Sequence, residues 1–450
     1  MRRKIVIASL VVATLIIIVI SQYPKLFIAT GYGAKTMATA VFLAGRDPQI
    51  VSLTDLNYSI VKYTRSIIDF EKKSVTTSIL GMAKQTAVYR EGFGCTLIGD
   101  LQADSVQKNS IILPLTRRVG VWRIAWPDGE FRKDTLFNEI DTIKLKTAID
   151  AAFDTSTEHN KSTAAVVVVY KGELVSEKYV RELGITSDTR ICGWSMTKGV
   201  INAMVGVMTR QGKLDVNASA PVSQWLKDPR RDITINDLMH MSSGLKWDEN
   251  YSDVSSVTRM LYRSSDCYLA AIEAPFHNKP GIEWKYSSGT TNIISGILRT
   301  LAGNDLVYHE YPYREIFNKI GISSMIIETD PAGNFVGSSY CYATARDWAR
   351  FGMLYYYDGV WKGDTILPKG WVHYTTTSVT ASRGEYGAQF WLNKSKKLPD
   401  VPDDMFSCQG HFGQRVFIIP SRKLIVVRLG FSEEGFNHNE FLKGIIAAIK

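Results

Sequence analysis

A serine and a lysine three residues apart stand at the start of a long apolar stretch, and together they could form a nucleophile and its base. The stretch is Cys192–Gly212 (CGWSMTKGVINAMVGVMTRQG), with Ser195 and Lys198 near its beginning. Apolar residues nearly all round it predict a buried helix, which we expect to begin near Ser195 and to end at Gly212, since glycine commonly closes a helix. Residues three apart share a helix face, so the lysine amine would lie beside the serine hydroxyl.

Burial gives this pair its chemistry. A fully buried amine can have its pKa lowered by roughly three to five units, and a neutral lysine can take the proton of a hydroxyl and so activate a serine as a nucleophile. The start of the helix would add backbone N–H groups and a positive dipole end for a developing oxyanion. The pattern S-x-x-K also occurs at Ser59, Ser105 and Ser243, but only Ser195 has a buried helix behind it. The same residues also fit an ordinary serine cap with a lysine that extends to solvent.

A second candidate stretch is the turn-rich loop Pro280–Gly289 (PGIEWKYSSG), which runs into an apolar helix predicted over 291–301. It contains Tyr286 and Ser288. A tyrosinate beside a lysine ammonium lowers the tyrosine pKa and raises the lysine pKa, so we expect the two groups to titrate as a unit and to shuttle a proton. Taken alone, the tyrosine also fits a ring that packs in a loop.

A third stretch, Gln409–Arg415 (QGHFGQR), opens a late strand and has glycines on both sides of His411. Glycine at the start of a strand lets a ligand or another backbone approach closely. A free N–H at this place would be a second oxyanion donor. Taken alone, the segment also fits an edge-strand turn with a surface histidine.

The elements around these stretches indicate an α+β fold. We expect one antiparallel sheet with flanking terminal helices, and a mainly helical lobe that carries the Ser195 helix and reaches about Gln389. The expected helices cover 141–153 and 441–449, and the expected strands cover 164–170, 174–179, 415–420 and 424–430. Residues 25–140 read as an ancillary extension of short strands and turns, with strand-type composition at 51–53 and 59–68. The catalytic domain would span 141–450.

The amino terminus resembles an export segment. Arg2, Arg3 and Lys4 precede an uncharged apolar run over Ile5–Ile20. Because bulky residues follow the run, we favour an uncleaved membrane anchor over residues 1–24, with the catalytic domain on the outer side of the membrane. The alternative is export followed by cleavage of the signal.

Composition excludes several classes of function. The net charge of +9 is spread along the 450 residues without a long Lys/Arg run, which argues against nucleic-acid binding. Five cysteines without a C-x-x-C pair predict free thiols rather than a zinc or redox motif. The absence of a pattern such as H-E-x-x-H predicts no metal, and we expect no cofactor. His240 could join a Ser-His-Asp triad with Ser195, although the G-x-S-x-G elbow lacks its second glycine. The sequence does not indicate an oligomeric state.

The three motifs together resemble the penicillin-recognising serine enzymes, in which S-x-x-K, Y-x-N or Y-x-S, and K/H-x-G follow in this order. The similarity is to the branch with class C β-lactamases, serine esterases, D-amino-acid peptidases and 6-aminohexanoate-dimer hydrolases. The segments Ile233–Leu245 and Thr344–Gly352 also resemble this branch. The resemblance covers the chain from about Asp141 to its end.

The resemblance implies a β-lactamase/transpeptidase-like fold and an acyl-enzyme mechanism. Ser195 would be the acylated nucleophile, and Lys198 and Tyr286 would share the roles of general base and acid. The backbone N–H groups of Ser195 and Gln414 would form the oxyanion hole. The substrate would lie beside Ser288, His411, Gly413 and Arg415.

Two departures from the family pattern bear on the substrate. His411 replaces the lysine of K-T-G, and a histidine is mostly neutral at pH 7, so the usual cation for a substrate carboxylate is missing unless Arg415 supplies it. Ser288 stands where many members have asparagine, as in the 6-aminohexanoate-dimer hydrolases. We therefore expect a small ester or linear amide as substrate, with weak or no β-lactam hydrolysis. The alternatives are a membrane-anchored sensor that stays acylated and a D-amino-acid peptidase for cell-wall peptides.

Overall fold

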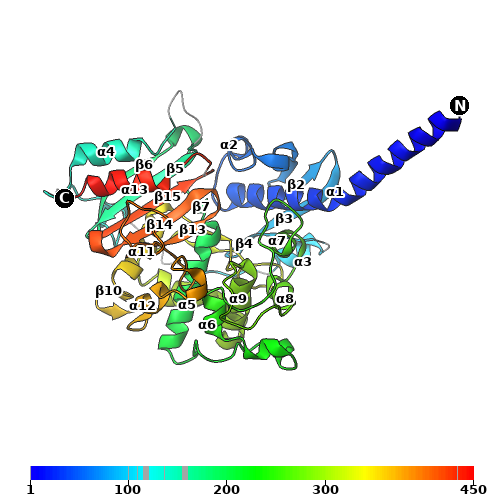
Figure 1. Ribbon diagram of the computed structural model, residues 1–450. Coiled ribbons are helices and arrows are strands. Elements are labelled where there is room, and N and C mark those ends of the chain that lie inside the picture. The colour runs from blue at the N-terminus through cyan, green and yellow to red at the C-terminus, as the bar shows by residue number, and fades with distance from the viewer. Residues whose placement is uncertain are drawn as a thin grey trace.

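The computed structural model describes residues 2–99, 101–108, 110–114, 121–135, 137–154, 161–432 and 434–450, with side chains from Gln22 onward. Figure 1 shows a sheet with helices on both faces, a lobe of helices beneath it, and a long N-terminal helix that projects from the body. The predicted α+β fold, with an antiparallel sheet, terminal helices and a helical lobe, is confirmed.

The main sheet has six strands in the order β12-β13-β14-β15-β5-β6, and every neighbouring pair is antiparallel. The two predicted hairpins, β14–β15 and β5–β6, lie side by side and supply four of its six strands. Strand bounds in the chain order are β5 Thr163–Tyr170, β6 Glu173–Tyr179, β12 Trp391–Leu392, β13 Phe406–Gly410, β14 Gln414–Ile419 and β15 Leu424–Gly430.

The central strands are buried on both faces, which explains their unbroken apolar runs. Alternate residues enter two different cores, because successive side chains on a strand point to opposite sides. Val166, Val168 and Val426 pack against the terminal helices α4 (Thr142–Asp150) and α13 (His438–Ala447). Side chains on the other face, among them Val167, Val169, Val416, Ile418, Ile425 and Val427, join the large core that continues into the helical lobe.

The helical lobe lies between β6 and β12 in the chain, as predicted. Helix α11 covers the second face of the sheet, where it contacts β5, β14 and β15. The helices are α5 Thr197–Arg210, α6 Ile235–Met239, α7 Ser256–Arg263, α8 Cys267–Ile272, α9 Ser288–Ala302, α10 Asp305–Pro312, α11 Ala345–Tyr356 and α12 Trp371–Thr376. Two small sheets accompany them: β7 Ile191–Cys192 with β9 Cys341–Ala343 and β8 Ile326–Ile327, and β10 Val360–Trp361 with β11 Asp364–Thr365.

The N-terminal part forms a helix packed on its own sheet. Helix α1 runs without a break from Arg2 to Phe42 and contacts all four strands of a four-stranded antiparallel sheet, as well as α7. Within the described ranges, none of the helices combines the length and the apolar character that a membrane span requires. The anchor predicted over 1–24 thus gains no support here. The strands are β1 Arg65–Asp69, β2 Ser74–Ile79, β3 Met82–Arg90 and β4 Gly94–Leu97.

Two strand predictions in the extension were wrong. Residues 51–53 belong to helix α2 (Pro48–Leu53), which begins with a proline at its first position and with Asp47 as a cap that accepts hydrogen bonds from two backbone N–H groups. Ser59–Tyr63 forms a 3₁₀ turn, and β1 begins only at Arg65. A capping residue and a proline therefore outweigh β-branched composition over so short a segment.

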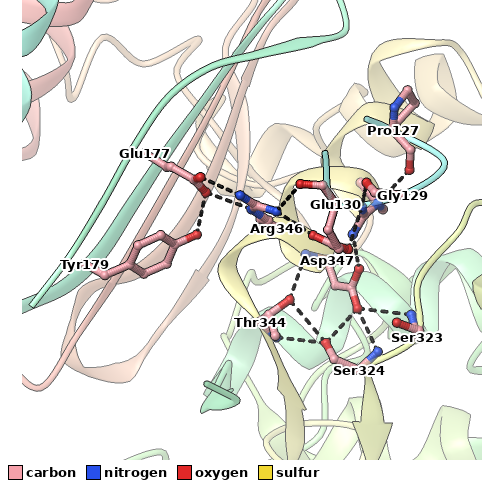
Figure 2. Close-up of polar contacts among 11 residues, drawn as sticks. Pro127, Gly129, Glu130, Glu177, Tyr179, Ser323, Ser324, Thr344, Arg346 and Asp347 are labelled. Atoms are coloured by element: carbon pink, nitrogen blue, oxygen red, sulfur yellow. Dashed lines mark hydrogen bonds and ion pairs between the residues drawn. The ribbon is translucent and has the colours of Figure 1, made fainter. Parts of the chain in front are cut away.

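A buried ionic cluster attaches the turn at residues 127–130 to the part of the chain after residue 141 (Figure 2). Arg346 of α11 pairs with Glu130 at 2.7 Å and with Glu177 of β6 at 2.5 Å. Arg350, one turn further on, pairs with Glu130 at 2.8 Å and with Asp347 at 2.6 Å. Planar guanidinium groups suit such multiple carboxylate contacts. The cluster fixes α11, the helix that covers the sheet beneath the candidate site.

Candidate active site

The serine of the first motif lies on a tight turn that leads into the buried helix. Trp194–Met196 forms a single 3₁₀ turn and α5 begins at Thr197, two residues later than predicted. Thr197 fixes this turn, because its hydroxyl donates to the Trp194 carbonyl at 2.6 Å and accepts from the Cys341 N–H at 3.0 Å. Ser195 is half-buried, whereas the following residues of α5 are buried. The serine is thus held rigidly and is still reachable.

Lys198 is buried, with 1% of its surface exposed, and its amine faces the serine. The Nζ atom lies 3.0 Å from Ser195 Oγ, 3.1 Å from Ser288 Oγ and 3.0 Å from the Ser338 carbonyl oxygen. Burial lowers the pKa of this amine to about 8, while the negative charge of Glu249 acts in the opposite direction. The amine is therefore neutral in a substantial fraction of molecules near pH 8.

The partners of Lys198 set the direction of its lone pair. The Ser338 carbonyl can only accept a hydrogen bond, and Ser288 donates its own hydroxyl proton to Glu249 at 2.5 Å, so both must accept from the amine. A neutral amine has two hydrogens, and these two contacts use both. The remaining lone pair points at Ser195, which can donate its proton to it. In this arrangement the lone pair of a neutral Lys198 amine can accept a proton from Ser195, whereas Ser288 and the Ser338 carbonyl have none to give it.

Tyr286 meets the same serine but does not form the predicted tyrosinate–ammonium pair. Burial raises the pKa of Tyr286, the charge of Glu249 raises it further, and a hydrogen bond with Ser195 partly opposes both. The Lys198 amine lies over the phenol ring, 4.8 Å from its centroid. The expected lowering of the tyrosine pKa is wrong, because desolvation and the charge of Glu249 outweigh the hydrogen bond with Ser195 and the charge of Arg415, which lower the pKa. Tyr286 therefore keeps its proton and is suited to act as an acid.

Glu249 is a member of the site that sequence reasoning missed. Its carboxylate accepts from the Ser288 N–H at 2.9 Å, from Trp247 Nε1 at 2.6 Å and from Tyr251 at 3.1 Å, in addition to the Ser288 hydroxyl. It fixes the first residue of α9 and supplies negative charge near the amine. The only available signal was its position shortly after the Ile233–Leu245 segment, which gives no indication of contact with a serine 39 residues later.

The third motif is the turn between β13 and β14. Gly410 ends β13 opposite Gln414, the first residue of β14, and both strands contact the Trp194–Met196 turn. Gly410 comes so close to Gly193 that a Cβ atom would lie 2.1 Å from the Gly193 carbonyl oxygen. The Gln414 side chain turns away and pairs with both backbone groups of Gly430. The Gln414 side chain is thus engaged away from the serine, and the oxyanion role of its backbone N–H stays a prediction.

His411, Gly413 and Arg415 differ in their access to the site. His411 is exposed, and its ring stacks on Tyr251 at 6.1 Å between centroids. Gly413 is buried with a φ of 74°, a conformation that favours glycine. Arg415 is only 9% exposed, and its Nη1 donates to the Gly410 and Gln414 carbonyl oxygens. It supports the turn rather than presenting a cation to a ligand, although its charge lowers the Tyr286 pKa.

The alternative triad is not formed. His240 directs its ring nitrogens to the carbonyl oxygens of Asn236 and Thr377, and burial lowers its pKa. All five cysteines are free, as predicted, and four of them are buried. Within the described ranges no group of three or more His, Cys, Asp or Glu side chains is placed to hold a metal ion.

Comparisons with known proteins identify the family to which the chain belongs. The family model described as Beta-lactamase matches residues 149–437. A 6-aminohexanoate-dimer hydrolase of Paenarthrobacter ureafaciens is 22% identical over 295 residues, which cover 59% of this chain and 72% of that protein. Two solved structures share the fold. A penicillin-binding protein homologue of Caulobacter crescentus gives a TM-score of 0.55 at 14% identity, over 70% of this chain and 99% of that one. A family VIII carboxylesterase gives a TM-score of 0.52 at 17% identity, over 70% of this chain and 98% of that one.

The matched region contains all three motifs and the paired serine and lysine. It spans all six strands of the main sheet and the helical lobe, and the terminal helices α4 and α13 lie at its borders. The chain belongs to the Beta-lactamase family and is a serine hydrolase.

Proposed function

We propose that this protein hydrolyses esters or linear amides through an acyl-enzyme on Ser195, with weak or no hydrolysis of β-lactams. The observation that carries the proposal is the Lys198 amine, which lies 3.0 Å from Ser195 Oγ and whose two hydrogens are used by Ser288 and the Ser338 carbonyl. A base with its lone pair fixed on a hydroxyl is what nucleophilic catalysis by serine requires.

The proposed reaction has two halves. Ser195 Oγ attacks the substrate carbonyl carbon while its proton passes to Lys198, and the oxyanion that forms accepts from the N–H groups of Ser195 and Gln414. When the carbon–oxygen or carbon–nitrogen bond breaks, the leaving group takes the Tyr286 proton, and the proton on Lys198 then restores the phenol. Water next attacks the ester of Ser195, loses its proton to the same groups, and releases the acid and the free serine.

The surroundings of Tyr286 support an apolar leaving group. Its ring lies 5.3 Å from Trp391 and 5.8 Å from Tyr386, and Trp284 contacts both of these residues. On the other side, His411 and the engaged guanidinium of Arg415 offer no exposed permanent cation. Penicillins and D-alanyl peptides carry a carboxylate that such a cation would bind, whereas a neutral ester or a linear amide needs none.

Labelling with a fluorophosphonate tests the nucleophile. The wild-type protein should be labelled, and Ser195→Ala should lose the label completely, because the phosphonate bonds to Ser195 Oγ. Ser243→Ala is the matched control, since it removes the serine of another S-x-x-K pattern and should keep full labelling. Undiminished labelling of Ser195→Ala would refute the assignment.

The acylated-sensor alternative is separated by time-resolved intact mass spectrometry with an activated ester. A hydrolase shows an adduct that disappears as the ester is consumed, whereas a sensor keeps it. A panel of esters, linear amides, D-peptides and penicillins then ranks the substrate classes. A penicillin turned over as fast as the best ester would contradict the proposed class.

We also propose that residues 1–24 anchor the protein with its catalytic part on the outer side of the membrane. The support is the basic start followed by Ile5–Ile20 and the unbroken α1 backbone from Arg2. Carbonate extraction of membranes tests it: an anchored chain stays in the pellet, and release of the full-length chain would contradict the proposal.

A further inference from the structure

The residue before the nucleophile has an unusual backbone conformation. Trp194 has a φ of 48°, in the left-handed region that a bulky side chain rarely adopts. Such a conformation persists only where the surrounding structure enforces it. Because Trp194 and Ser195 share a peptide unit, the conformation of the first sets the direction of the second. What holds the Trp194 ring therefore also holds the nucleophile.

One face of the Trp194 ring is covered by the N-terminal extension. Tyr32 of α1 stacks on it with 5.8 Å between centroids and 4° between the ring planes. Tyr340, His411 and Phe412 approach the same indole at angles of 60° to 88°. Trp194 is 7% exposed and Tyr32 is 5% exposed, so the stack is buried. The ring beneath the nucleophile turn is thus enclosed by two parts of the chain that lie far apart in sequence.

Tyr32 is itself fixed in place. Its hydroxyl donates to the Asp55 carbonyl at 3.3 Å, and its ring also contacts Tyr58 and Tyr262. One turn further along α1, the Lys35 amine forms a buried ion pair with Glu328 and lies 4.2 Å from the centroid of the Tyr340 ring. Residues three apart share a helix face, so Tyr32 and Lys35 hold one face of α1 against the hydrolase part, residues 141–450.

We propose that Tyr32 is a positioning residue for Ser195: its ring holds Trp194 in the left-handed conformation that directs the hydroxyl at Lys198. The extension then belongs to the catalytic unit rather than standing beside it. This inference rests on the proposed function, in which Ser195 is the nucleophile. Displacing a reacting group by about 1 Å can cost about a hundredfold in rate, so a loosened turn should slow acylation measurably.

The test compares second-order rate constants for fluorophosphonate labelling in the full-length chain. Tyr32→Leu keeps apolar bulk but removes the stacked ring, and we expect it to react about 10- to 100-fold more slowly than wild type. Tyr32→Phe keeps the ring and should restore the rate to within about twofold. Met37→Ala is the control, because it truncates a buried side chain of α1 one turn beyond Gly33, which faces Thr64 and Thr77. The labelling rate of Met37→Ala should stay near that of wild type, even if its Tm falls as far as the Tm of Tyr32→Leu.

A double-variant cycle keeps the inference testable if the leucine variant is unstable. Adding Tyr32→Leu to Trp194→Leu should slow labelling no further than Trp194→Leu alone, since the stack is already lost. The inference is overturned if Tyr32→Leu reacts as fast as wild type, if Met37→Ala slows as much, or if the two leucine effects multiply. Failure of the proposed function has a different signature, namely a Ser195→Ala protein that is still labelled.

Discussion

The low pKa of Lys198 makes the pH dependence of acylation a direct test of the mechanism. Lys198 must be neutral to accept the Ser195 proton, and its pKa of about 8 lies below the ordinary value of 10.5. The neutral fraction is about one half at pH 8, about a tenth at pH 7 and about a hundredth at pH 6. We therefore expect kcat/KM for a neutral activated ester to rise about tenfold per unit from pH 6 to 7 and to level off above pH 8 to 9.

Replacing Glu249 should move this profile in a defined direction. The negative charge of Glu249 favours the ammonium form, so its removal lowers the Lys198 pKa further. Glu249→Gln keeps the size of the side chain, and its kcat/KM should reach the plateau at a lower pH than in wild type. Glu283→Gln is the control, because Glu283 is an exposed carboxylate in the loop before Tyr286.

Stopped-flow release of nitrophenol under single-turnover conditions measures the acylation step alone. A rate that is flat from pH 6 to 8 would refute a titrating lysine base. A rate that still rises tenfold per pH unit between pH 9 and 10 would indicate an ordinary lysine pKa. It would contradict the lowering of the Lys198 pKa by burial. A Glu249→Gln profile displaced to higher pH would show that the charge of Glu249 is not felt at the amine.

Two further predictions concern the buried ion pair and the third motif. Lys35→Met should lower the free energy of unfolding by about 3–5 kcal/mol in urea titrations, because it leaves Glu328 buried without its cation. The control, Lys146→Met, breaks an exposed pair with Asp150 and should lower it much less. Equal losses of stability in the two variants would contradict the prediction. His411→Lys should speed acylation by penicillins relative to acylation by the ester, since it restores a cation for the penicillin carboxylate. Mass spectrometry of the acylated protein measures both rates. An unchanged ratio of the two rates would show that position 411 does not select the substrate.

The hydrolase part was predictable because its segments carry strong local patterns. The valine run of β5, the apolar surface of α5 and the hairpin around Ser421 each specify an element within a few residues, and all of them formed. In the extension the segments are short. There the cap Asp47 and the proline Pro48 stabilise a helix where composition predicted a strand. Local composition is a weak guide where one capping interaction supplies much of an element's stability.

The pairing of Ser195 with Lys198 followed from helix periodicity, but their surroundings did not. The carboxylate of Glu249 reaches the site through a loop, and sequence spacing says nothing of contacts made by a loop. The pKa of Tyr286 depends on how deeply its phenol is buried, which only the packing of Tyr386 and Trp391 around it reveals. For the same reason, the stacking of Tyr32 on Trp194 was invisible from the sequence.

Glu328 carries a consequence for how the chain reaches its native state. Its carboxylate accepts hydrogen bonds from Lys35, from the Thr39 hydroxyl and from the Cys95 N–H, and all three donors lie within the first hundred residues. A polypeptide that started at residue 141 would lack all three donors to the Glu328 carboxyl group. We therefore expect the family region, residues 149–437, to fold poorly when it is produced without the N-terminal extension. Folding of the enzyme would then depend on that extension.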